Sequence, residues 1–197
     1  MKHSDKDTKK IRKAMEKVQD EKRFEHTIGV AYTAMALAMK YDVPIKDAEV
    51  AGLLHDCAKC MEHEKKIALC EKHNISMTDI ERRNPYLLHA KVGSFLAMDT
   101  YQIKNMDIIN AILNHTTGRP GMSLLEKIIF VADYIEPGRN QASNLAAIRK
   151  LAFEDIDKAL LWILKDMLLY LQSTGGEIDP MTQKTYDYYK EQLQINQ

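Results

Sequence analysis

Apolar residues recur at three- and four-residue steps along nearly the whole chain, which is the period of an α-helix. The stretch 24–41 shows this spacing clearly, because Val30, Ala34, Leu37 and Tyr41 fall on one face. No stretch of useful length alternates between apolar and polar residues, as a half-buried strand would. The pattern therefore predicts an all-α fold class.

Capping residues and helix breakers divide this pattern into separate elements. Asn84 followed by Pro85 suits a helix start, and Ser123 with Glu126 has the spacing of a capping box. Glycine and proline between residues 116 and 121 predict a loop. The predicted helices cover 24–41, 46–56, 62–73, 77–83, 85–99, 106–114, 123–136, 144–172 and 180–193.

We expect these helices to form one domain spanning residues 1–197. Within it, residues 1–10 are expected to be frayed, the motif-bearing core covers about 20–140, and C-terminal helices cover about 144–193. No linker is long enough to separate two domains.

Charge and composition exclude several classes of protein. The chain has 28 basic and 28 acidic residues, whereas nucleic-acid binders usually show a basic excess or stripe. It lacks an apolar run long enough to cross a membrane, and its charged N-terminus lacks a signal-peptide core. The three cysteines, an odd number, are typical of reduced thiols. We expect a cytoplasmic protein without nucleic-acid or membrane partners, and a homodimer stays open.

Several ionisable residues stand where the helical pattern calls for apolar ones. His55, Asp56, His89 and His115 each follow an apolar run, and Asp133 lies inside another. Burial of an unpaired carboxylate costs several kcal/mol, so Asp133 should be paired or bound to a metal. One such histidine alone is usually a satisfied core residue, but so many together favour a common site.

The residue types suit a transition-metal centre. Imidazoles and carboxylates without convincing thiolates are compatible with iron, manganese, zinc, nickel or cobalt. His55 and Asp56 can converge on one ion from the end of one helix. His26 from another helix and Asp133 complete the predicted set of four metal ligands.

Basic residues flank these predicted ligands. Arg23 precedes His26 by one helical turn, Lys59 follows the His-Asp pair, and Arg119 and Arg139 stand in glycine- and proline-rich loops. Arginine suits phosphate oxygens because its planar fork offers paired donors. For Arg23 alone a solvated surface position is the more common role, but the four cations together favour a phosphate-bearing substrate.

The ordered set His26, His55–Asp56 and Asp133 resembles the H…HD…D signature of the HD-domain metal-dependent phosphohydrolases. Longer strings spanning about 23–139 resemble one family among them, the YqeK family. These strings are Arg23-Phe-Glu-His26-Thr-Ile-Gly29-Val30, Gly52-Leu-Leu-His55-Asp56-Cys-Ala-Lys59, Asn84-Pro-Tyr-Leu-Leu-His89-Ala, His115-Thr-Thr-Gly118-Arg119-Pro-Gly-Met-Ser and Lys127-Ile-Ile-Phe-Val-Ala-Asp133-Tyr-Ile-Glu136-Pro-Gly-Arg139.

This resemblance implies a helical HD bundle with extra C-terminal helices and a centre of one or two metal ions, most often iron. It also implies symmetrical bis(5′-nucleosyl)-tetraphosphatase activity, which cuts diadenosine tetraphosphate into two ADP. The partners would then be a dinucleoside polyphosphate and a nucleoside diphosphate. Alternatives are another HD-domain nucleotidase or phosphodiesterase, a nucleotide-binding HD protein without turnover, and a plain helical interaction protein.

The expected mechanism is attack by metal-activated water on a central phosphorus atom. His89 and His115 either contact phosphate and protonate the leaving group, or ligate a second metal that Asp56 bridges. Tyr134 and Glu136 are candidates for lining the nucleotide pocket, with packing an equal alternative for Tyr134. The expected substrate-binding residues are Arg23, Lys59, His89, His115 and Arg139, and the expected catalytic residues are Asp56, His89 and His115.

Overall fold

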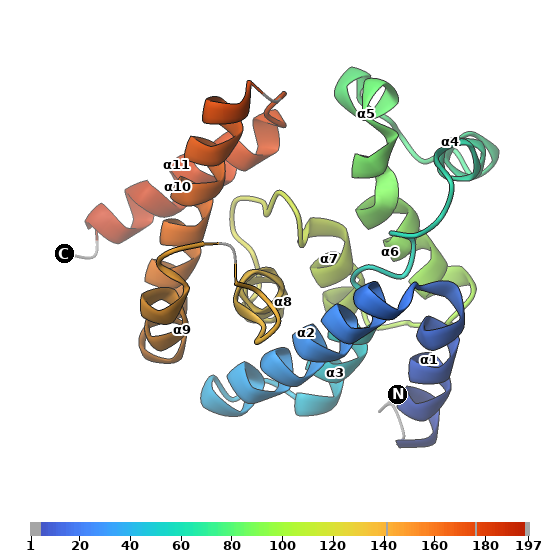
Figure 1. Cartoon of the computed structure of the whole chain (residues 1–197), viewed down its shortest axis with the longest axis horizontal. Coiled ribbons are helices and arrows are strands. Elements are labelled where there is room, and N and C mark those ends of the chain that lie inside the picture. The colour runs from blue at the N-terminus through green and yellow to red at the C-terminus, as the bar shows by residue number, and fades with distance from the viewer. Residues whose placement is uncertain (1–4, 141, 176, 196–197) are drawn as a thin grey trace.

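The computed structural model describes residues 5–140, 142–175 and 177–195, and these contain helices but no strand, which confirms the all-α fold class (Figure 1). None of the described helices is both long enough and apolar enough to span a membrane. The elements are α1 (Asp5–Val18), α2 (Glu21–Lys40), α3 (Ile45–Leu54), α4 (His63–Lys72), α5 (Asp79–Arg83), the 3₁₀ helix η1 (Pro85–Leu88), α6 (His89–Asp99), α7 (Met106–Asn114), α8 (Leu124–Ile135), α9 (Leu145–Glu154), α10 (Ile156–Thr174) and α11 (Pro180–Ile195).

Helix α8 lies at the centre of the arrangement and packs against α2, α7 and α10 (Figure 1). Helices α9, α10 and α11 lie on one side of it, while α4, α5 and α6 lie beyond α7 on the other. The core that joins these parts is made of fully buried aliphatic side chains, including Leu37 of α2, Ile129 of α8 and Ile163 of α10. Helices α3 and α8 lie directly against α2, and α7 packs against both of them.

The close approach of α2 and α3 depends on Gly52. A Cβ atom at this position would lie 2.7 Å from the Cα of Ala31, inside any normal contact distance. Because the obstacle is backbone, a side chain could not be accommodated by a rotamer change. Gly52 thus brings the end of α3, where His55 and Asp56 stand, against α2.

One predicted helix is interrupted in the structure. The predicted helix over 144–172 is two helices, because Asp155 has an extended backbone, with φ −150° and ψ 101°, and caps α10 by accepting a hydrogen bond from the Lys158 amide. The apolar period continues across the break, since both helices face one core, so the period could not reveal it. Gly175, with φ +67°, ends α10 as expected.

Residues 5–10 form the first turns of α1, and the expectation that the stretch 1–10 is frayed stays a prediction. Residues 1–4 lie outside the described part of the chain. Ile11 and Met15, four residues apart, are buried and hold α1 in place against α3. Ile11, Ala14, Met15 and Val18 do recur at helical spacing, but they are few among many charged residues, and the helix was missed in the sequence.

Candidate metal centre and adjoining cavity

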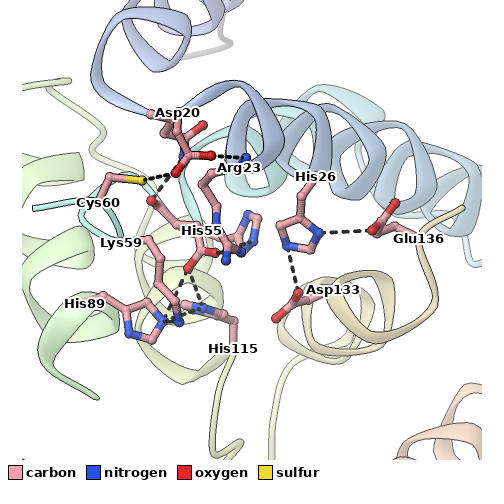
Figure 2. Close-up of polar contacts among 12 residues, drawn as sticks. Asp20, Arg23, His26, His55, Lys59, Cys60, His89, His115, Asp133 and Glu136 are labelled. Carbon is pink, nitrogen blue, oxygen red and sulfur yellow. Dashed lines mark hydrogen bonds and ion pairs between the residues drawn. The ribbon is translucent and has the colours of Figure 1, made fainter. Parts of the chain in front are cut away.

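The four predicted metal ligands lie together where α2, the end of α3 and the end of α8 meet, and Figure 2 shows His26, His55 and Asp133 of this set. His26 Nε2 is 3.1 Å from Asp133 Oδ1, and His55 Nε2 is 3.6 Å from Asp56 Oδ2. One donor atom from each of His26, His55 and Asp56 lies within 4.8 Å of the others, and the same holds for His55, His115 and Asp133. The described residues thus form one cluster of imidazoles and carboxylates.

Three of the histidines make the same local hydrogen bond, which orients their rings towards this cluster. Each donates from Nδ1 to the carbonyl oxygen three residues earlier, over 2.7 Å in every case. Carbonyls at helix ends lack intrahelical donors and so are free to accept. With the hydrogen on Nδ1, the Nε2 atoms present lone pairs to the centre. The pairs are His55 with Gly52, His89 with Tyr86 and His115 with Ile112.

The atoms that face the centre fit a metal ion. His26 Nε2, His55 Nε2 and Asp56 Oδ1 are buried and have no partner in hydrogen-bond geometry. Buried polar atoms without a partner are costly. A metal ion bound by imidazole nitrogens and carboxylate oxygens would satisfy their lone pairs. The cluster is therefore able to bind a divalent metal.

Charges in the cluster match this assignment. Burial opposes ionisation of Asp56, but His55 and the other surrounding imidazoles hold the pKa of its carboxyl well below the usual value. Burial lowers the pKa of His55 to about 4, so its ring is neutral near pH 7. The pKa of Asp133 is also lowered, because the His26 contact outweighs desolvation. Ionised carboxylates and neutral imidazoles are the forms that ligate metals.

A second part of the cluster contains His89, His115 and Lys59. Asp56 Oδ1 lies 3.3 Å from His89 Nε2 and 3.5 Å from His115 Nε2. Lys59 Nζ is 3.2 Å from His89 Nε2, and burial together with this ammonium group lowers the pKa of His89 to about 3. Burial also acts against protonation of His115, but the Asp56 carboxylate outweighs it and raises the pKa of His115.

Two of the predicted phosphate-binding arginines reach the centre. Arg23 Nη1 lies 2.8 Å from Asp56 Oδ2, and Arg139 Nη2 lies 2.7 Å from Asp133 Oδ1. Their side chains are 28% and 45% exposed, so each guanidinium also faces solvent. Each therefore has donors left for an anion beside the carboxylate that it holds.

Two further residues have other positions than the sequence suggested. Arg119 makes a two-point ion pair with the buried Glu126, with both distances 2.7 Å, and does not join the cluster. Glu136, a candidate for the nucleotide pocket, instead contacts His26, whose Nδ1 donates to Glu136 Oε1 over 3.1 Å. The pair is separated by 110 residues, so no local pattern could have indicated it.

A cavity of about 660 Å³ opens directly beside the centre. His115 and Asp133 line it and also belong to the cluster. Aromatic side chains of α8 and α10, Tyr134 and Tyr170 among them, form part of its wall. Asn144, which donates to the Asp166 carboxylate, supplies polar atoms there. A volume of this size suits a ligand as large as a nucleoside.

Comparison with known proteins agrees with this geometry. The family described as HD domain matches residues 23–138, a range that includes all four predicted ligands. The chain belongs to the HD-domain family. A relative from Bacillus subtilis (strain 168) is 41% identical over 170 residues, which is 85% of this chain and 89% of the relative. It is named symmetrical bis(5′-nucleosyl)-tetraphosphatase.

Other relatives extend the similarity. A protein of the same name from Staphylococcus aureus (strain NCTC 8325 / PS 47) is 34% identical over 171 residues, 86% of this chain and 87% of that protein. A crystal structure from Clostridium acetobutylicum, described as a predicted HD superfamily hydrolase involved in NAD metabolism, is 41% identical, with a TM-score of 0.90 over 93% of this chain and 97% of that one. The family resemblance read from the sequence strings is thereby confirmed.

Proposed function

We propose that this chain is a metal-dependent hydrolase that cuts diadenosine tetraphosphate symmetrically into two ADP. The observation that carries the proposal is that His115 and Asp133 belong to the His/Asp cluster and also line the cavity. A phosphate chain held at the cluster would lead directly into a space of nucleoside size. The names of the relatives from Bacillus subtilis and Staphylococcus aureus support the same activity.

His26, His55, Asp56 and Asp133 are the proposed ligands of the metal. The buried atoms of His26, His55 and Asp56 that lack a hydrogen-bond partner support this assignment, as does the place of Asp133 in the same cluster. Iron is the proposed metal, and manganese, cobalt, nickel and zinc are compatible with the same ligand types. A bound ion of this kind supplies a Lewis acid that activates water near neutral pH.

Arg23, Lys59 and Arg139 are the proposed phosphate-binding residues. Arg23 and Arg139 approach the centre from different elements, α2 and the segment after α8, and pair with different carboxylates there, so they could hold oxygens on either side of the reacting phosphorus. Each guanidinium carries five donors in a fixed plane, which lets it hold a carboxylate and a phosphate together. These cations would offset the charge that develops on the phosphoryl oxygens.

His89 and His115 are assigned to the substrate and not to a second metal. Asp56, His89 and His115 do offer three donor atoms within 4.8 Å of one another, which keeps the second-metal alternative open. The Lys59 ammonium at 3.2 Å from His89 disfavours another cation there. In the proposed reaction, protonated His115 donates a hydrogen to the leaving phosphate oxygen. His89 accepts from Lys59 and keeps that ammonium directed at the phosphates.

The C-terminal helices are proposed to complete the nucleoside site. Tyr170 and Asp166 of α10 and Asn144 before α9 line the cavity, although all three lie outside the matched range 23–138. Apolar and aromatic walls with few polar groups are typical of pockets that hold a base. The residues that select this substrate would thus lie partly beyond the HD domain itself.

Product analysis tests the proposed function. Diadenosine tetraphosphate is incubated with the protein in the presence of iron or manganese, and the nucleotides are separated by ion-exchange chromatography. Two ADP per substrate, without AMP or ATP, are expected. Formation of AMP together with ATP would show asymmetrical cleavage and contradict the proposal. Binding of the substrate without turnover would favour a nucleotide sensor. A matched panel of nucleoside monophosphates and cyclic nucleotides checks the alternative HD activities.

A further inference from the structure

His26 is held differently from the other histidines of the cluster. His55, His89 and His115 donate from Nδ1 to a carbonyl at a helix end. His26 lies well inside α2, where the carbonyl three residues earlier belongs to Arg23. Inside an α-helix each carbonyl already accepts from the amide four residues later. The His26 ring therefore needs an acceptor from outside its own helix.

Glu136 supplies that acceptor (Figure 2). His26 Nδ1 lies 3.1 Å from Glu136 Oε1, and the Gly138 amide donates to Glu136 Oε2 over 2.6 Å. Glu136 is only 4% exposed, so its carboxylate is removed from water and is held by these two contacts. On the other edge of the ring, His26 Nε2 faces Asp133 at 3.1 Å.

The chain leaves space for this carboxylate in the packing of α2. A Cβ atom on Gly29 would lie 2.5 Å from Glu136 Oε2, and one on Gly138 would lie 3.0 Å from the same oxygen. Glycine inside a helix is about 1 kcal/mol less favourable than alanine. Gly29 costs α2 some helix stability, but its missing side chain leaves room for the Glu136 carboxylate.

The segment that bears Glu136 is anchored by α9. The Arg149 guanidinium donates to the backbone carbonyls of Ile135, Glu136 and Arg139, over 2.8 to 2.9 Å. These contacts hold the end of α8 and the following turn in one conformation. The position of the Glu136 carboxylate is therefore set by backbone contacts and not by a flexible surface chain.

We propose that Glu136 is a positioning residue for the metal centre: it binds the Nδ1 hydrogen of His26 and so directs the Nε2 lone pair at the metal. The proposal rests on the metal-ligand role of His26 given under Proposed function. A carboxylate in this position fixes the ring orientation and the tautomer, and it makes the imidazole a stronger donor.

Metal affinity of two variants at this position tests the proposal. Glu136→Ala removes the acceptor, and the Kd for Mn²⁺, measured by competition with a chelator, is expected to rise about 10- to 100-fold. Glu136→Gln keeps an amide oxygen that can accept from Nδ1, so its Kd should rise less. Glu81→Gln is the matched control, because Glu81 is another buried carboxylate, 5% exposed and paired with Lys91, outside the cluster.

The Nδ1 hydrogen of His26 gives a readout that a purely structural role would not change. In the zinc-loaded protein, proton–nitrogen-15 NMR is expected to show this hydrogen shifted downfield and protected from exchange in the natural sequence and in Glu136→Gln, because a side-chain oxygen at position 136 accepts it. In Glu136→Ala the signal is expected to move upfield and to exchange faster. A Glu136→Ala protein that keeps both the natural Nδ1 signal and the natural Kd for Mn²⁺ would overturn the proposal.

Gly29→Ala provides a second route if Glu136→Ala does not fold. Alanine suits the helix, but its Cβ atom would displace the carboxylate from His26, so the Kd for Mn²⁺ is expected to rise. Combined with Glu136→Ala it should cause no further loss, since the obstructed oxygen is gone. An unchanged Kd in folded Gly29→Ala, or fully additive losses in the double variant, would contradict the proposal.

Failure of this proposal is separable from failure of the proposed function. Weaker metal binding in Glu136→Ala, with no ADP formed by the natural sequence, would reject the substrate and retain the role of Glu136. Symmetrical cleavage by the natural sequence, with unchanged metal binding in Glu136→Ala, would retain the substrate and reject the role of Glu136.

Discussion

Lys59 Nζ lies 3.2 Å from His89 Nε2, and both side chains lie across the cluster from His26 (Figure 2). Two unit charges of the same sign 4 Å apart repel by about 4 kcal/mol at an effective dielectric constant of 20, and a divalent ion doubles this. An ammonium group in this position therefore opposes a second metal and favours an anion. Because of this contact, we propose that His89 and His115 bind the substrate and do not ligate a second metal.

The number of metals tests this role directly. We expect His115→Ala to keep as much metal as the natural sequence, measured by inductively coupled plasma mass spectrometry. Hydrolysis should fall about 10²- to 10⁴-fold, as is usual when a general acid is removed. Loss of about half of the bound metal in this variant would instead make His115 a ligand of a second ion.

Asp56→Ala is expected to abolish both metal content and hydrolysis while leaving a helical circular dichroism spectrum. Asp56 is the carboxylate that both halves of the cluster share, so no neighbouring group can replace it. Asp155→Asn is the control, because asparagine also caps a helix well and Asp155 lies at the start of α10. Normal metal and full activity in Asp56→Ala would refute the proposed centre.

Arg23→Gln should lower kcat/KM by about 10- to 100-fold, since a hydrogen bond to a charged group contributes about 1.5–3 kcal/mol. The bound metal should remain, because Arg23 is not among the proposed ligands. Arg83→Gln is a suitable comparison: Arg83 also pairs with a carboxylate, that of Glu177, but outside the cluster. Equal kinetics for the two variants would remove Arg23 from the substrate site.

Tyr170→Ala tests whether the cavity holds a base. Stacking of a base on an aromatic ring contributes about 1–3 kcal/mol, so KM for diadenosine tetraphosphate should rise while metal content stays the same. Tyr170 is 67% exposed, and its removal should hardly change thermal stability. Tyr32→Ala is the control, because Tyr32 is also an exposed tyrosine but lies on α2 outside the cavity, and it should leave KM unaltered.

A comparison of two glycines tests whether α2 and α3 depend on the close approach at Gly52. Gly52→Ala should lower the free energy of unfolding by about 1–3 kcal/mol, because the added carbon meets the backbone of Ala31 at 2.7 Å. Gly93→Ala, where the nearest atom is 3.4 Å away, should fold with nearly unchanged stability. Urea denaturation of both proteins measures the difference, and equal stability would reject the close-packing explanation.

Much of the fold could be predicted because its helices are amphipathic and end at recognisable residues. The Ser123–Glu126 capping box forms as expected at the start of α8. The break at Asp155 was missed, since helices that face one core share an apolar period across a short interruption. Helix α1 was missed because few apolar residues carry its period and most of its other residues are charged.

The chemistry of the cluster was readable from the sequence for a similar reason. His55, His89 and His115 each stand at a helix end, directly after an apolar run or one residue beyond it, where burial of a polar ring requires a function or a partner. The sequence therefore singled out these residues and the metal-binding character of the group. Their distances, and the pairing of Arg119 with Glu126 in place of substrate, could not be derived, because they depend on how separate helices pack.

By itself, the sequence determined the helical class, the family and the kinds of side chain that meet at the centre, since these follow from local periodicity and from short ordered strings. Only the tertiary structure decided that Lys59 approaches His89, that the cavity continues from Asp133 to α10, and that Glu136 holds His26. These relationships join residues far apart along the chain, and the packing of several helices sets them through contacts that no single segment encodes.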